Sequence, residues 1–343
     1  MAKPAPPVRS RHRVAVVTDS TAALPAGAAA RWGIDVVPLD VVVDGRPHTE
    51  GVDLAPADLV AALRAGAKVS TSQPAPEAFS RAYARAAAAG ASAVVSVHLS
   101  GELSGTVASA RSAAERAPLP VHVVDSRSVA MGIGFAALAA AWEAAGVPDE
   151  ARLVAGLPPG PSPARHLPGR ASDLAADLRH LPGWAAELLP GLLRREEPAT
   201  ADQVADAARA AASAATVWFL VDSLEHLRRG GRLSAAAAAL GTVLGLRPLL
   251  TVADGRVVVG EKIRTRRAAR ERLEAVAVAA AGGHRRVRLA VHHTGDAEAA
   301  AGLAARLPES LGDRCREVVV SDAGAVLGAH AGPGLLAVVV APV

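Results

Sequence analysis

The chain has 343 residues, of which 51% are hydrophobic and 20% are charged. This length exceeds the usual size of one domain, and the composition can bury a large core, so we expect two packed domains rather than a disordered chain. The net charge is only +4 and aromatic residues make up 2%. Both values argue against nucleic-acid binding, because a strongly basic surface and a platform of stacking rings are missing.

Residue patterns exclude several further classes of protein. The apolar runs at 129–142 and 235–246 are too short to span a membrane, so we expect at most transient membrane contact. Residues 1–13 lack an apolar stretch, so we expect a disordered tail and not a signal peptide. We therefore expect a cytoplasmic location. Cys315 is the single cysteine, so no internal disulfide or cysteine-based zinc site is possible, and we expect no cofactor.

Residues 14–146 alternate short aliphatic runs with alanine-rich helical stretches. This alternation predicts a domain of three layers, a parallel sheet between two layers of helices. The predicted strands are Val14–Thr18, Ile34–Val43, Ala93–His98 and Val121–Asp125, and the predicted helices are Ala22–Trp32, Ala57–Ala65, Glu77–Ala89, Ser104–Glu115 and Val129–Ala145.

The residue composition changes between residues 147 and 200, and the regular alternation of strands and helices stops. Prolines and glycines crowd Leu157–Gly169, and short amphipathic pieces follow. Such a composition is typical of irregular connections, so we interpret 147–200 as an insertion or lid.

Regular patterns return in residues 201–343, which we expect to form a second α/β domain. Asp254-Gly255 lies between two aliphatic runs and predicts a tight hairpin turn. A hairpin combined with crossover connections indicates a mixed sheet with helices on one face, a two-layer arrangement. The predicted strands are Thr216–Asp222, Arg247–Val252, Arg256–Gly260, Val287–His293, Arg316–Ser321 and Leu336–Ala341, and the helices are Ala201–Ala212, 235–246, Arg266–Ala281 and Ala297–Leu307.

The strongest local signal for a ligand is the run Ser100-Gly101-Glu102-Leu103-Ser104-Gly105-Thr106. It follows a predicted strand and opens a helix, so hydroxyls and backbone N–H groups meet at one spot suited to an anion. Ser70-Thr71-Ser72-Gln73-Pro74 adds neutral donors suited to a carboxylate. Each run has an alternative reading, a capped helix or an ordinary turn.

Other motifs leave two readings open. Asp19-Ser20-Thr21 and Asp125-Ser126 each end a strand, where they cap the next helix or share a pocket. Gly230-Gly231-Arg232 and Arg264 place guanidinium groups near tight backbone, and His330 lies in a predicted turn before the last strand. The spacing around Ser104 does not match the nucleophile elbow of hydrolases. Neither a phosphate-binding loop, a dinucleotide fingerprint at a strand end, nor a zinc-binding histidine pair occurs in the sequence.

Taken in order, these motifs resemble the DegV family, whose members include the fatty-acid-binding subunit of bacterial fatty-acid kinase. The resemblance runs from Val14 to the C-terminus except for the 147–200 segment. It departs from the family at Ala331, where threonine is common. The motifs are Asp19-Ser20-Thr21, Thr71-Ser72-Gln73-Pro74, Leu103-Ser104-Gly105-Thr106, Asp125-Ser126 with Met131-Gly132-x-Gly134, Leu227-x-x-Gly230-Gly231-Arg232, Arg264-Thr265 and His330-x-Gly332-Pro333-Gly334.

The resemblance implies a two-domain α/β fold with a long-chain fatty acid between the domains. It implies that Thr71, Ser104 and His330 hold the carboxylate, with Arg264 and Ser100 as secondary candidates, and that the acyl tail occupies an aliphatic tunnel. It also implies a non-catalytic protein that presents the fatty acid to a separate kinase subunit, which forms the acyl phosphate.

Two alternatives stay open. One is a regulatory interaction protein with a vestigial acyl site, in which residues 147–200 contact the partner. The other is an acyl hydrolase that uses Ser104 and His330 together with Asp19 or Asp125.

Overall fold

The computed structural model describes residues 14–72, 74–147, 152, 198–233 and 247–343. The expected tail (1–13), most of the 147–200 segment and the expected helix at 235–246 lie outside the described residues. The rest forms an α/β fold with one parallel sheet and one larger mixed sheet, which confirms the predicted fold class.

The first sheet has four strands in the order β2-β1-β6-β7, all parallel. Every residue of Ala93–His98 is buried, as expected for a central strand covered on both faces. The strands are β1 (Val14–Asp19), β2 (Ile34–Val37), β6 (Ala93–His98) and β7 (Val121–Asp125).

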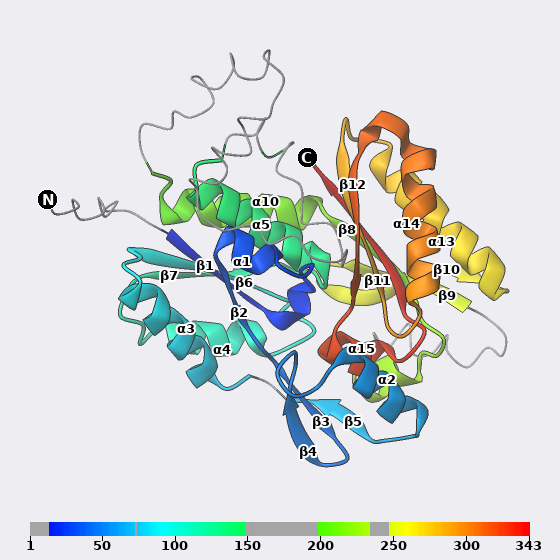
Figure 1. The fold of residues 1–343 in the computed structure, drawn as a ribbon, viewed down its shortest axis with the longest axis horizontal. Coiled ribbons are helices and arrows are strands. Elements are labelled where there is room, and N and C mark those ends of the chain that lie inside the picture. Colours follow the sequence, from blue (N-terminus) through cyan, green and yellow to red (C-terminus); the bar gives the residue numbers. More distant parts are fainter. Residues whose placement is uncertain (1–13, 73, 148–151, 153–197, 234–246) are drawn as a thin grey trace, which may run out of the picture.

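Helices cover both faces of this sheet (Figure 1). On one face, α3 and α4 bury Phe79 and Tyr83 against the strands. On the other face lie α5 and α10, which pack along each other although residues 145–200 separate them in sequence. The helices of this part are α1 (Ala28–Trp32), α2 (Pro56–Arg64), α3 (Pro76–Ala88), α4 (Thr106–Ala114), α5 (Met131–Ala144) and α10 (Ala201–Ala214), with a 3-10 turn η1 at Ser20–Ala22.

The second sheet has six strands in the order β10-β9-β8-β13-β11-β12, and only the β11–β12 pair is parallel. Helices α13 and α14 cover one face. Its strands are β8 (Thr216–Leu220), β9 (Arg247–Ala253), β10 (Arg256–Ile263), β11 (Val287–His293), β12 (Cys315–Asp322) and β13 (Leu336–Pro342). The helices are α11 (Glu225–Arg229), α13 (Arg266–Ala281), α14 (Ala297–Leu311) and α15 (Ala325–Ala331), with a 3-10 turn η3 at Gly312–Arg314.

The two sheets share their middle layer of helices. The free face of the six-stranded sheet contacts α5 and α10, so α5 lies between the sheets (Figure 1). Its residues from Met131 to Leu138 are all buried, which explains why this helix is apolar on every side. None of the described helices combines the length and apolarity needed to cross a bilayer.

The predicted hairpin forms and joins the two domains. Asp254 and Gly255 both have positive φ, at 51° and 78°, as a tight two-residue turn requires. The hairpin tip lies against the loop after β6, where Ser100 Oγ donates to the Gly255 carbonyl at 2.7 Å. Arg127 Nη2 donates to the Asp254 carbonyl at 2.8 Å. This turn therefore holds the second domain on the first.

Two predicted elements are wrong in their extent. The helix expected at Ala22–Trp32 is broken into η1 and α1, because Pro25 and the left-handed Gly27 (φ 82°) interrupt it. The strand expected at Ile34–Val43 splits at Pro38 into β2 and a strand of a different sheet. Proline has no N–H to donate, so it ends the ladder there.

A third, smaller sheet and two short helices, α11 and α15, were not predicted. The small sheet has the order β4-β3-β5 and is antiparallel. Its strands β3 and β5, together with α2, contact α15 (Figure 1). Its strands are short and partly exposed, so they lack the alternation that marks a strand. His330 lies on α15 and not in a turn as expected. The strands are β3 (Asp40–Val43), β4 (Arg46–Thr49) and β5 (Val69–Thr71).

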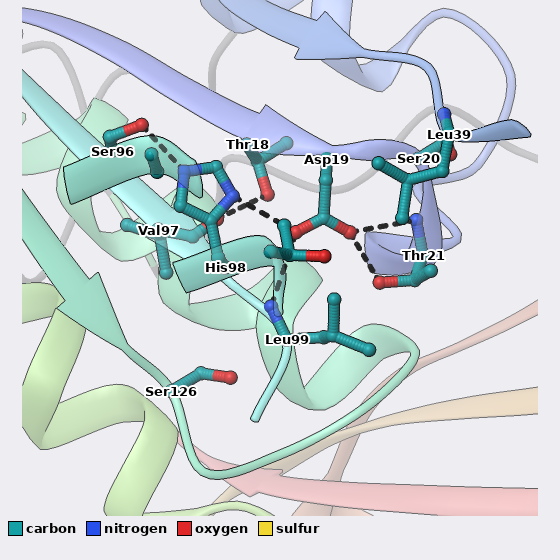
Figure 2. A network of polar contacts seen from close by, with 12 residues as sticks. Thr18, Asp19, Ser20, Thr21, Leu39, Ser96, Val97, His98, Leu99 and Ser126 are labelled. Atoms are coloured by element: carbon teal, nitrogen blue, oxygen red, sulfur yellow. Dashed lines mark hydrogen bonds and ion pairs between the residues drawn. The ribbon is translucent and has the colours of Figure 1, made fainter. Parts of the chain in front are cut away.

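A fully buried carboxylate ties the ends of β1 and β6 together (Figure 2). Asp19 Oδ2 accepts from His98 Nδ1 at 2.9 Å and from the Leu99 N–H at 3.1 Å. Its Oδ1 accepts from the Thr21 N–H at 3.1 Å and from the Thr21 hydroxyl. This confirms the predicted capping role of Asp19.

The network continues through the sheet to the opposite layer of helices. His98 Nε2 lies 2.6 Å from Ser96 Oγ, to which the Tyr83 hydroxyl donates at 3.0 Å. Burial raises the pKa of Tyr83 to about 12, so its phenol keeps the proton that it donates. The chain of contacts from α3 to Asp19 is therefore satisfied without water.

We predict that Asp19→Asn lowers the free energy of unfolding by about 3 kcal/mol. Both oxygens of Asp19 accept hydrogen bonds, so the NH2 group of asparagine would face buried donors of either Thr21 or His98 and Leu99. The matched control is Asp35→Asn, which removes the surface pair with Arg85 and should cost less than about 1 kcal/mol. Urea unfolding of both variants measures the difference. Equal losses would show that the Asp19 network does not stabilise the fold as argued.

Candidate functional site

A cavity lies between the two domains and the small sheet. Among the described residues, its walls are mostly aliphatic, with Phe219 as the only ring on an apolar residue. Leu39 and Leu99 come from the first domain, and Val217 and Val257 from the second. Six polar residues of the described part also line it, namely Thr71, Ser72, Ser104, Arg232, His292 and His330.

Thr71 and His330 meet at this cavity from opposite halves of the chain. Thr71 Oγ1 lies 2.8 Å from His330 Nε2, a hydrogen bond between residues 259 apart in sequence. Burial and the charge of nearby Arg232 lower the pKa of His330 to about 4, so the ring is neutral near pH 7. When Nε2 carries the ring proton, it donates to Thr71, and the hydroxyl hydrogen of Thr71 is free to donate to a ligand.

Ser104 lines the same cavity at the start of α4. Its Oγ accepts from the Thr106 N–H at 3.3 Å and lies 2.8 Å from the Thr106 hydroxyl. With Thr106 donating in both contacts, the Ser104 hydrogen can point at an anion in the cavity. The predicted cap by Ser104 is wrong, because α4 begins at Thr106 with Gly105 at its N-cap position and no side chain caps it there. Ser104, one residue earlier, remains available for the predicted ligand contact.

Arg232 adds a positive charge to this group. Its Nε donates to the Leu103 carbonyl at 2.9 Å, and its Nη1 donates to the Gly230 carbonyl. Burial lowers the pKa of this guanidinium, which stays charged because its ordinary value is far above neutrality. Its Nη2 makes no hydrogen bond within the part of the chain that the structure describes, so it can reach a carboxylate.

The structure does not bring the two secondary candidates to the cavity. Ser100 is buried and its hydroxyl is bound to the Gly255 carbonyl. Arg264 is exposed in the bend between β10 and α13 and does not line the cavity. Asp125 and Ser126 also lie away from it, where they bond neighbouring backbone N–H groups.

The contacts do not assemble a hydrolase triad. Asp19 bonds His98, and Asp125 accepts from the Gly101 and Arg127 N–H groups. Among the described residues, no carboxylate bonds His330, whose partner is a threonine hydroxyl. A serine nucleophile at Ser104 would therefore lack a histidine base oriented by an acid.

His292 is fully buried and forms another part of the cavity wall. Its Nε2 accepts from the Met131 N–H at 3.3 Å, so the ring proton is on Nδ1, 3.1 Å from Ser321 Oγ. Ser321 Oγ in turn donates to the Ala23 carbonyl at 3.2 Å. Burial, followed by the nearby His293, lowers the pKa of His292 to about 4. Nε2 joins the domains directly, and Nδ1 does so through Ser321. Both ring nitrogens therefore have protein partners.

Comparison with known proteins places the chain in a family. The DegV family model, described as an uncharacterised protein of the DegV family, matches residues 13–146 and 193–343. A DegV domain-containing protein of Streptomyces coelicolor is 41% identical, and the alignment covers 96% of this chain and 99% of that protein. The chain belongs to the DegV family. Residues 147–192 fall between the two parts that the model matches.

Solved DegV structures share the fold. A DegV family protein from Thermus thermophilus, described as fatty-acid binding, has 33% identity and a TM-score of 0.73, over 96% of this chain and all of that one. DegV from Bacillus subtilis, described as a fatty acid binding protein, has 27% identity and a TM-score of 0.74, over 97% of this chain and all of that one.

Sequence reasoning missed three polar residues in the cavity of this DegV-family chain. Ser72 and Arg232 were recognised within their motifs but not assigned to the site, although the glycine pair before Arg232 signals close backbone packing. His292 carries no local signal, because its contact with the first N–H of α5 joins residues 161 apart in sequence.

The low pKa of His292 predicts acid sensitivity. The pKa of His292 is about 4 in the folded protein and 6.5 in the unfolded chain. The protein is therefore fully stable with respect to this group above pH 6.5, and it loses stability as the pH falls from 6.5 toward about 4, because the unfolded chain binds the proton first. We expect this group to cost about 2 kcal/mol of unfolding free energy between pH 7 and 4.5. His292→Gln preserves an acceptor and a donor but does not titrate, so its loss over this range should be smaller by that amount in urea unfolding. Parallel pH profiles would contradict the assignment.

Proposed function

We propose that this protein binds a long-chain fatty acid in the cavity between its domains, with the carboxylate at Thr71, Ser104, His330 and Arg232. The observation that carries the proposal is the Thr71–His330 hydrogen bond in the wall of an otherwise apolar cavity. A neutral histidine and two hydroxyls provide directed donors without burying several charges, and Arg232 supplies one cation. The fatty-acid-binding descriptions of its relatives support the same ligand.

The aliphatic wall suits a flexible acyl chain. Transfer of about fourteen methylenes from water contributes on the order of 10 kcal/mol before the costs of ordering the chain. The polar residues then select an acid over an uncharged lipid, because a hydrogen bond to an ionised carboxylate is stronger than one to a neutral group.

We further propose that the bound acid is presented to a separate kinase subunit, which makes the acyl phosphate. Ser72 both lines the cavity and is exposed, so the carboxylate end lies close to solvent and within reach of a partner. The sequence contains no phosphate-binding loop of its own, which is consistent with a partner that supplies the nucleotide. The protein itself then acts as a non-catalytic lipid-binding subunit in the cytoplasm.

Binding is tested first by denaturing organic extraction of the purified protein and mass spectrometry. We expect one fatty acid per chain, and Ser104→Ala should weaken palmitate binding by roughly 1–3 kcal/mol, about fivefold to a hundredfold, since a hydrogen bond to a charged group is lost. Ser213→Ala, which removes a surface hydroxyl bound to Ala210, is the control and should change nothing. An empty protein that takes up no added palmitate would refute the proposal.

The kinase hand-off is tested with protein loaded with palmitate. Incubation with Mg-ATP and an extract of the source cells should produce palmitoyl phosphate, which hydroxylamine traps as the hydroxamate. The yield should fall with Ser104→Ala in proportion to its lost occupancy. If the loaded protein gives no more hydroxamate than free palmitate at the same concentration, presentation to a kinase is wrong.

A further inference from the structure

The short helix α15 forms one wall of the cavity and carries His330. Val326, Leu327, His330 and Ala331 on this helix all line the cavity. The residue before the helix is Gly324, with φ 86°, which has no side chain to cap the first turn. A helix of only two turns depends on contacts from elsewhere to stay in place.

The missing cap comes from Glu50, 276 residues away in sequence. Its Oε1 accepts from the Val326 N–H at 2.9 Å, and the side chain is 9% exposed. An acidic group at this end of a helix also meets the positive end of its dipole. Gly324 leaves the space for this approach, because a Cβ there would lie 2.4 Å from Glu50 Oε1.

The same small sheet holds both ends of α15. The Glu50 N–H donates to the Leu39 carbonyl at 2.9 Å, just before β3, and Thr71 pairs with Val41 of β3. Glu50 therefore holds the first turn of α15, while Thr71 bonds His330 in its last turn. The two contacted residues are one helical turn apart, roughly 6 Å along the helix axis.

Leu59 of α2 supports the middle of the helix. A Cβ at Gly328 would lie 2.8 Å from Leu59 Cδ2, so the two helices touch there. Loss of the Glu50 contact would leave α15 free to tilt about this point. A tilt moves the two ends in opposite directions, so it displaces His330. Most of the apolar wall stays in place, because residues such as Leu99, Val217 and Val257 belong to other elements.

We propose that Glu50 is a positioning residue for recognition of the ligand carboxylate, acting from the first turn of α15 on His330. This inference rests on the proposed fatty-acid binding. Burial raises the pKa of Glu50, but both forms of the carboxyl keep an oxygen that accepts from Val326. The contact therefore needs an acceptor of this length rather than a charge.

The test compares palmitate with 1-hexadecanol, which has the same chain and no carboxylate. Glu50→Ala should weaken palmitate binding about tenfold and leave hexadecanol binding within about twofold, since one hydrogen bond is worth about that factor. Glu50→Gln retains an amide oxygen at the same length and should restore palmitate binding to within about threefold. Asp53→Ala removes an acceptor for the Thr49 N–H in the same loop and should behave as wild type, because the hydrogen bond and ion pair of Asp53 within the described residues go to Thr49 and His48 and not to α15.

Two further measurements keep the test decisive. Gly324→Ala attacks the same contact from the side of α15, so it should reproduce the selective loss if Glu50→Ala fails to fold. The imidazole 15N shifts of His330 in the ligand-free protein should change in Glu50→Ala and return in Glu50→Gln.

The outcomes separate this proposal from the proposed function. Palmitate affinity that is unchanged in both Glu50→Ala and Gly324→Ala, palmitate and hexadecanol affinities that fall together, or unaltered His330 shifts would overturn the role of Glu50 while fatty-acid binding stands. A wild-type protein that takes up neither ligand would overturn fatty-acid binding and the role of Glu50 with it.

Discussion

A carboxylate buried in a protein must be surrounded by donors, and Asp19 meets this requirement at the end of β1 (Figure 2). The donors come from the first turn after β1 and from the end of β6, so the two strand ends are held in one geometry. Next to Asp19, Ser20 Oγ accepts from the Leu39 N–H at 3.1 Å, just before the small sheet. The segment that follows β6 runs through Leu99 to Ser104, and Leu39, Leu99 and Ser104 all line the cavity. The position of the site therefore follows from how one charge is satisfied.

The shared helix layer is the second constraint. Because α5 is apolar on every side, it is stable only between two sheets, and this brings the six-stranded sheet against the first domain. The cavity lies at the interface of the two domains, beside α5, and is closed by the hairpin, α15 and the small sheet. His292 and the Asp254-Gly255 turn cross this interface with hydrogen bonds, which keeps the two walls in register.

The proposed carboxylate site is assembled from short elements that have little stability of their own. Thr71 ends a strand of three residues, and His330 belongs to a helix of seven. Each is held by the other and by Glu50, Leu59 and the glycines that permit close approach. Such an arrangement places directed donors next to a mostly apolar cavity without a large cluster of buried charge, as the proposed binding of a long-chain acid requires.

The sequence by itself determined the larger elements and singled out two of the polar motifs that line the cavity. The alternation of aliphatic strands and alanine-rich helices predicts both sheets, because periodicity is a local property of the chain, and Arg266–Ala281 and Val287–His293 have the predicted bounds. The hydroxyl-rich motifs at Thr71 and Ser104 could be singled out for the same reason. The tertiary structure alone decided that Ser100 joins the domains, that Arg232 rather than Arg264 lines the cavity, and that Glu50 caps α15. These outcomes depend on contacts between residues more than a hundred positions apart, or on which way a guanidinium turns, and no local pattern of residues encodes either.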